Sequence, residues 1–201
     1  MDAVTQLLES YVSLRAGPVT DALALTGLEA ARDGLLAWHA DPDGDGATAA
    51  RSRMALASLL SGICLANAGL GAVHGLASPL GALLPIPHGV ACGATLVPVT
   101  AANVAALERR DASNPALDRY ARLGRLLAGL PAGVPATEAR AALVATLQSW
   151  TITLETPGLG TFGLDEAAIP AVVADARGSS MRTNPIVLDD AELAAILRDA
   201  R

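Results

Sequence analysis

The chain has little with which to bind nucleic acid or to build a disulfide-held fold. It contains no lysine, its net charge is −6 and its isoelectric point is about 4.9. Because phosphate binding needs a basic face, this balance argues against a nucleic-acid partner. The two cysteines, Cys64 and Cys92, are too few for a disulfide scaffold and lack zinc-finger spacing, so we interpret them as inert buried thiols. The N-terminus shows no basic-then-apolar signal pattern, and we expect a cytoplasmic protein.

Aromatic residues are also scarce. They make up 2% of the chain, whereas 52% of it is hydrophobic. A core of alanine, leucine, valine and isoleucine favours packed helices over a β-sandwich, whose strands prefer aromatic and β-branched residues. A length of 201 residues suits one domain with a substantial core of its own. The composition therefore predicts a single all-α domain over residues 1–201.

The hydrophobic pattern predicts helices along most of the chain. Thr20 is expected to be the N-cap of the second helix, and Asp189 with Glu192 forms a capping-box pattern before the last one. Asp21 lies in the first turn of the second predicted helix, where the helix dipole favours an acidic residue. The predicted helices cover residues 2–13, 20–38, 47–70, a segment around His74, 89–110, 118–130, 137–150 and 193–201.

Charged residues are absent between Met54 and Leu107. Residues 54–84 are long enough to span a bilayer. They contain His74 and Pro79 together with several glycines, however, and no aromatic belt flanks them. A helix buried at the centre of a soluble bundle is the favoured interpretation, and no membrane partner is expected.

Two of the three histidines, His74 and His88, lie inside this uncharged segment. An imidazole in apolar surroundings must be hydrogen-bonded, bound to a metal or placed in a ligand cavity, because an unpaired buried polar group is costly. A satisfied core histidine is the common case, but two in one such run favour a site. A metal site would need further ligands, and Asp2 and Gln6 share one helical face through their i, i+4 spacing.

Two other motifs are weaker. The aspartates of residues 41–45 resemble a calcium loop, but the distal bidentate glutamate that such a loop requires is absent. Residues 158–163, Gly-Leu-Gly-Thr-Phe-Gly, match the dinucleotide-binding pattern G-x-G-x-x-G. That fingerprint needs a second strand one helix later, and residues 177–185 read as loop, so we interpret the match as coincidental.

Taken together, these segments resemble the C-terminal helical domain of the iron-containing alcohol dehydrogenases, a family related to dehydroquinate synthase. The resemblance extends over nearly the whole chain, and its most specific part is similar to the family's metal-site signature. It implies an all-α helical bundle of the dehydroquinate synthase-like C-terminal type. The matching segments are residues 1–13, 20–25, 71–81 with Pro87-His88-Gly89, and 179–181 with Asn184-Pro185.

The resemblance implies a bound Fe²⁺ or Zn²⁺, held by an aspartate and three histidines, that polarises an alcohol or aldehyde oxygen while hydride passes to or from NAD(P). Carried over by position, the metal ligands are Asp2, His74 and His88. The remaining position, a histidine in the family, is Gln6 here, whose neutral amide is a weaker ligand than imidazole. Gln6 is expected to be a weak fourth ligand or a neighbour of the ligands.

Ser78 is the candidate catalytic residue. It stands four residues after His74, where the family often has another histidine near the nicotinamide. Its hydroxyl can hydrogen-bond a substrate but is no general base near neutral pH without help. With Gln6, this departure suggests a branch with weakened metal chemistry, and the maleylacetate reductases are related enzymes.

The family's nucleotide sits mainly on an N-terminal Rossmann-like domain, and nothing in residues 1–201 resembles that domain. The resemblance therefore implies the substrate- and metal-binding half of an NAD(P)-dependent alcohol dehydrogenase or aldehyde reductase. We expect it to need a nucleotide-binding domain or partner chain for redox chemistry, and to form a homodimer. The alternative is a stand-alone, non-redox helical protein that uses the same pocket for ligand binding or partner assembly.

Overall fold

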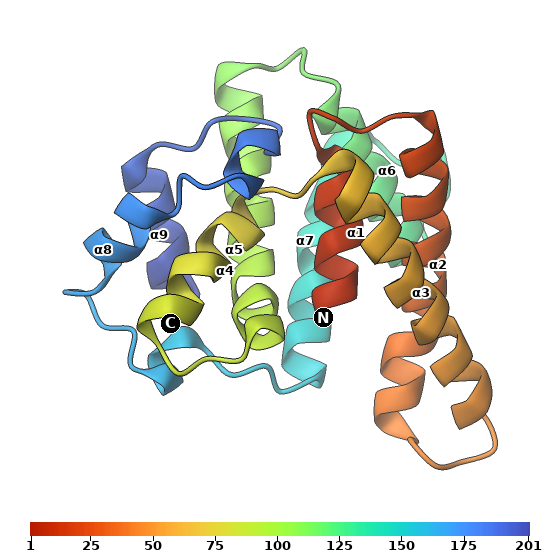
Figure 1. The fold of residues 1–201 in the computed structure, drawn as a ribbon. Helices are drawn as coiled ribbons and strands as arrows, with labels where there is room; N and C mark the ends of the chain where they lie inside the picture. Colours follow the sequence, from red (N-terminus) through yellow and green to blue (C-terminus); the bar gives the residue numbers. More distant parts are fainter.

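The computed structural model describes all 201 residues and is built entirely from helices and loops (Figure 1). No strand is present, so the predicted all-α class is confirmed. The helices are α1 (Asp2–Val12), α2 (Pro18–Ala40), α3 (Ala47–Ala68), α4 (Ala72–Leu83), α5 (His88–Arg110), α6 (Ala116–Ala128), α7 (Ala136–Thr153), α8 (Ile169–Asp175) and α9 (Asp190–Asp199), with 3-10 turns η1 (Leu159–Phe162) and η2 (Ser180–Thr183).

Helix α1 lies in the middle of the bundle and contacts α2, α3, α5 and α6 (Figure 1). Helices α2 and α3 pair along one side, and α6 pairs with α7. On the other side α4 pairs with α5, while α8 and α9 pack against α4 and α5. A single cluster of 42 buried apolar residues connects these layers, and alanine and leucine supply most of it. The first helix of the chain is therefore held from several sides.

The N-cap of the second helix lies three residues earlier than predicted. Gly17 is its N-cap and Pro18 its first residue, so the prediction of Thr20 as the cap is wrong. Proline is well suited to a first helical position because its missing N–H would have no partner there and its φ is already helical. The Thr20 hydroxyl instead accepts a hydrogen bond from the Gly17 N–H (2.9 Å) inside the first turn.

The capping box of the last helix is present as predicted. The Glu192 N–H donates to Asp189 Oδ1 (2.8 Å), and the Asp189 N–H donates to Glu192 Oε2 (2.9 Å). These reciprocal bonds satisfy two backbone donors that the helix itself leaves free.

The uncharged run does not form one buried helix. Helices α3 and α4 are bent by 100° at a break of three residues, and Gly69 at that break has φ +72°, which suits glycine. Helix α4 is buried as predicted over most of its length, with Ser78 and residues 81–83 exposed. The prediction is wrong for α3, because its outer face has no neighbour and exposes four large side chains, Leu56, Leu59, Ile63 and Leu65.

By length and composition α5 could span a membrane, as could α3 and α4 if they were one segment. In this fold 61% of the apolar window of α5 is buried against other helices. Core helices of soluble proteins pass the same test of length and hydropathy.

The glycine-rich segment 158–163 forms turn η1 and is not part of a strand–turn–helix unit. Helix α7 runs to Thr153 ahead of it, and the next helix begins only at Ile169. A side chain at Gly158 would collide with the backbone carbonyl of Arg201, and the Leu159 N–H donates to the carbonyl of Ala200 (2.8 Å). The motif therefore packs against residues 200 and 201, which confirms that its match to the dinucleotide pattern is coincidental.

Candidate metal centre

Three segments that are far apart in the sequence bring their polar side chains to one point. Asp2 comes from the first residue of α1, His74 from the first turn of α4, and His88 and Cys92 from the first two turns of α5. One donor atom from each of these residues lies within 4.8 Å of the others. Such a convergence of a carboxylate, two imidazoles and a thiol offers the ligand types of a transition-metal site.

The distances within this group are short. Asp2 Oδ1 lies 3.3 Å from His74 Nε2 and 3.8 Å from His88 Nε2. Cys92 Sγ lies 3.7 Å from His74 Nε2 and 3.6 Å from His88 Nε2. His74 and Cys92 are buried, Asp2 is partly buried, and the His88 side chain is 56% exposed. The centre is therefore closed on the His74 side and reached from solvent on the His88 side.

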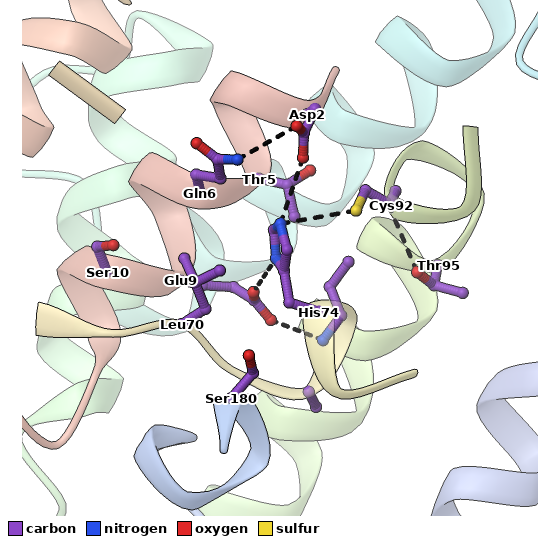
Figure 2. A network of polar contacts seen from close by, with 12 residues as sticks. Asp2, Thr5, Gln6, Glu9, Ser10, Leu70, His74, Cys92, Thr95 and Ser180 are labelled. Atoms are coloured by element: carbon purple, nitrogen blue, oxygen red, sulfur yellow. Dashed lines mark hydrogen bonds and ion pairs between the residues drawn. The ribbon is translucent and has the colours of Figure 1, made fainter. Parts of the chain in front are cut away.

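Glu9 holds the inner face of His74. Its Oε2 accepts a hydrogen bond from His74 Nδ1 (2.7 Å; Figure 2). Its Oε1 accepts one from the Val73 N–H (2.6 Å). With Nδ1 engaged in this way, Nε2 is the ring atom that faces Asp2 and Cys92. Glu9 is 3% exposed, so this pairing is insulated from water.

The polar contacts shift the pKa values of the group. Burial alone would lower the pKa of His74, but its hydrogen bonds to Asp2, Cys92 and Glu9 outweigh burial and raise it to about 12. The hydrogen bond from His74 lowers the pKa of Asp2, and burial raises the pKa of the Cys92 thiol. A metal-free site thus holds an imidazolium between two carboxylates, and a bound cation would replace the proton on Nε2.

The bend before α4 is fixed by side chains from two distant segments. In loop 69–71, the Gly69 carbonyl accepts a hydrogen bond from the Ser10 hydroxyl (2.9 Å). The next carbonyl, of Leu70, accepts one from the Thr183 hydroxyl (2.6 Å). Asn184 Oδ1 accepts from the N–H of Ala72, the first residue of α4 (3.0 Å). These bonds set the direction in which α4 leaves the loop and thereby aim His74 at Asp2.

Comparison with known proteins decides the family. The model of the Fe-containing alcohol dehydrogenase family, C-terminal, matches residues 1–201. The chain belongs to this family.

Curated family members match the whole chain. The 1,3-propanediol dehydrogenase of Klebsiella pneumoniae is 33% identical over 202 residues, covering 100% of this chain and 49% of the relative. Alcohol dehydrogenase 4 of Schizosaccharomyces pombe is 35% identical over 201 residues, covering 100% of this chain and 44% of the relative. The chain thus spans about half the length of the curated relatives it matches.

Solved structures show the same fold. A crystal structure of 1,3-propanediol oxidoreductase superposes with a TM-score of 0.89 at 31% identity, covering 100% of this chain and 50% of that one. Maleylacetate reductase from Rhizobium sp. strain MTP-10005 superposes with a TM-score of 0.76 at 23% identity over 99% of this chain and 50% of that one, a similarity that shows the fold alone.

Within this family domain, Gln6 lies beside the centre and contacts one of its members. Its Nε2 donates to Asp2 Oδ2 (3.2 Å), and its Oε1 accepts from the Ser61 hydroxyl of α3 (2.8 Å). Both ends of the amide are therefore engaged, and the contact orients the Asp2 carboxylate. The sequence allowed Gln6 to be either a weak ligand or a neighbour of the ligands, and its role at a bound metal stays a prediction.

Ser78 lies on α4 one turn after His74 and is exposed, with no hydrogen bond from its side chain to the rest of the protein. Its contact with a substrate stays a prediction.

Sequence reasoning missed Glu9 and the place of Cys92. Two spacings could have found them. Glu9 is seven residues after Asp2, two helical turns along the same face, and is an acidic residue within a buried helix. Cys92 is four residues after His88 and shares its face of α5.

Proposed function

We propose that this chain is the substrate- and metal-binding half of an iron-type, NAD(P)-dependent alcohol dehydrogenase or aldehyde reductase. Redox chemistry would require a nucleotide-binding half, on the same chain or on a partner, in a cytoplasmic and homodimeric enzyme. The observation that carries the proposal is the meeting of Asp2, His74 and His88 at one point of the domain, with donor atoms 3.3 and 3.8 Å apart.

The residues present fit the metal that the family implies. One carboxylate and two imidazoles are ligands that Fe²⁺ and Zn²⁺ both accept. Glu9 holds Nδ1 of His74 in the way that carboxylates orient metal-binding histidines elsewhere. When bound, the ion would supply Lewis-acid polarisation of an alcohol or aldehyde oxygen.

The surroundings of the centre support a small, partly apolar substrate. A shallow groove beside Asp2 is lined in part by Leu35, Pro87, Val90 and Leu154. Such a surface would hold the carbon chain of an alcohol while the alcohol oxygen points toward Asp2, His74 and His88. Ser78 would donate a hydrogen bond to the substrate from the exposed face of α4. Oxidation removes a hydride and a proton from the alcohol, and NAD(P) would take the hydride.

The test is to join this chain to the N-terminal half of a family member, load it with Fe²⁺ or Zn²⁺, and follow NAD(P)H formation with small primary alcohols. We expect turnover that is lost in His74→Ala and kept in Cys64→Ser, because Cys64 is buried away from the centre near the Thr20 carbonyl. Absence of turnover in the metal-loaded, complete protein contradicts the proposal.

The second candidate is the stand-alone, non-redox protein. The exposed leucines and isoleucine of α3 favour it, because an apolar face of this kind suits assembly with a partner. The coding sequence upstream of Met1 discriminates the two. An in-frame nucleotide-binding segment supports the enzyme, whereas a stop codon followed by a ribosome-binding site supports the stand-alone protein.

A further inference from the structure

We propose that Cys92 is the fourth protein ligand of this centre, which makes it a carboxylate–diimidazole–thiolate site with a preference for Zn²⁺ over Fe²⁺. The inference rests on the metal-binding part of the proposed function. The family resemblance implies a histidine at position 6 as the remaining ligand. The proposed ligand is instead a cysteine, at position 92.

The distances fit four ligands around one ion. A tetrahedral zinc with nitrogen and oxygen ligands at about 2.0–2.1 Å and sulfur at about 2.3 Å places nitrogen and sulfur about 3.5 Å apart, and nitrogen and oxygen about 3.3 Å apart. Cys92 Sγ lies 3.7 Å from His74 Nε2 and 3.6 Å from His88 Nε2. Asp2 Oδ1 lies 3.3 Å from His74 Nε2, and its longer distance of 3.8 Å to His88 involves an exposed ring that is free to adjust.

The direction of the side chains supports Cys92 over Gln6. Figure 2 shows the Cys92 sulfur pointing at His74, whereas the Gln6 amide points at the outer oxygen of Asp2. The other end of Gln6 is occupied by the Ser61 hydroxyl. A neutral amide with both ends engaged is a poor ligand, and a thiolate is a strong one for zinc.

Charge and hardness agree with the assignment. Asp2 and Cys92 as ligands bring two negative charges to the two positive charges of the ion, and the Glu9 carboxylate, which accepts from His74 Nδ1, adds a third outside the ligand set. Sulfur is a soft donor, and its presence shifts the preference toward zinc.

The chain contains its own control. Cys64 is the other cysteine, is also buried, and lies near the carbonyl of Thr20 (3.6 Å) with no histidine beside it. If the spectroscopic signature of a bound thiolate came from any buried cysteine, both residues would produce it.

The test is a titration of the 201-residue chain with Co²⁺, which replaces Zn²⁺ and gives a near-ultraviolet sulfur-to-metal charge-transfer band only when a thiolate is bound. We expect one equivalent of Co²⁺ with this band in the unchanged chain and in Cys64→Ser. In Cys92→Ser the band should disappear and affinity should fall at least tenfold, while circular dichroism reports folding. Added Zn²⁺ should displace the cobalt, and equimolar Fe²⁺ should not.

X-ray absorption of the zinc-loaded, unchanged chain gives a second readout that does not depend on how the variant folds. We expect one sulfur neighbour at about 2.3 Å. Bound cobalt without the band, zinc without a sulfur neighbour, or a band that survives in Cys92→Ser overturns the Cys92 assignment and leaves the proposed function standing. Failure of the unchanged chain to bind Co²⁺ or Zn²⁺ contradicts the metal-binding part of the proposed function as well.

Discussion

Most of α3 and all of α4 come from the same uncharged stretch of sequence, residues 54–107, and the two helices have different environments. In α4 the side chains of Val73, His74 and Leu76 are buried, whereas in α3 Leu59 is 62% exposed. The difference lies in the neighbours: α4 is enclosed by α5, α8 and η2, while α3 contacts α1 and α2 on one face only. Similar hydrophobic composition can therefore build either a wall of the candidate site or an open apolar surface, and packing decides between them.

The largest difference in stability between the two helices is expected at their leucines. We expect Leu76→Ala in α4 to lower the free energy of unfolding by about 2–5 kcal/mol, because a fully buried side chain leaves a cavity. Leu59→Ala in α3 should change it by less than about 0.5 kcal/mol, because its side chain already meets solvent. Urea unfolding followed by circular dichroism measures both, and equal losses would contradict the assigned packing.

The buried histidine of α4 should make the free energy of unfolding depend on pH, an effect with no counterpart in α3. In the metal-free chain the pKa of His74 is raised from 6.5 to about 12, so the folded state keeps a proton that the unfolded state loses above pH 6.5. This contribution to stability is complete below pH 6.5 and declines as pH rises toward about 12, by up to about 1.4 kcal/mol per pH unit.

Urea unfolding in EDTA between about pH 6 and about pH 9 measures this decline. His74→Gln should flatten it, since the amide does not titrate in this range. A free energy of unfolding that rises with pH in the unchanged chain would contradict the placement of His74 between two carboxylates.

The glycine that precedes α4 and a glycine within α3 should respond in opposite directions. A Cβ at Gly71 would lie 2.8 Å from Glu9 Oε1 and from Asn184 Oδ1, so Gly71→Ala should cost about 1–3 kcal/mol by disturbing buried hydrogen bonds. Gly62 of α3 has open space around its Cβ position, and Gly62→Ala should stabilise the chain by about 0.5–1 kcal/mol through helix propensity. Thermal unfolding of both variants checks the signs.

A modest effect is expected in the loop that separates the two helices. Thr183→Val removes the hydroxyl that donates to the Leu70 carbonyl (2.6 Å) and should cost about 1 kcal/mol. Thr183→Ser retains the donor and should cost less. Denaturant unfolding distinguishes them, and an equal loss in both variants would mean that the methyl group matters more than the hydrogen bond.

Much of the fold could be predicted because its signals are local. The apolar periodicity predicted eight of the nine helices to within a few residues but missed α8, and the Asp189–Glu192 capping box was readable as a pattern. Thr20 was misassigned because a proline at the first helical position outweighs a good capping residue two places later.

The candidate site was predictable only in part. Asp2, His74 and His88 could be placed together through the family resemblance, and their binding of a metal stays a prediction. Glu9 was missed because an acidic residue in a helix is ordinarily exposed, and its burial depends on His74, 65 residues away. Cys92 was interpreted as an inert thiol because nothing local shows that α1 and α4 bring other donors to its sulfur.

By itself the sequence determined the helical class, because composition and periodicity are properties of neighbouring residues, and its resemblance to the family indicated three of the polar residues that meet in the bundle. Only the tertiary structure decided which apolar helix is enclosed, which way Gln6 points and that a cysteine joins the histidines. Those outcomes depend on the bend at Gly69 and on hydrogen bonds between segments far apart in the chain, and the energy of such contacts exists only once the helices are packed.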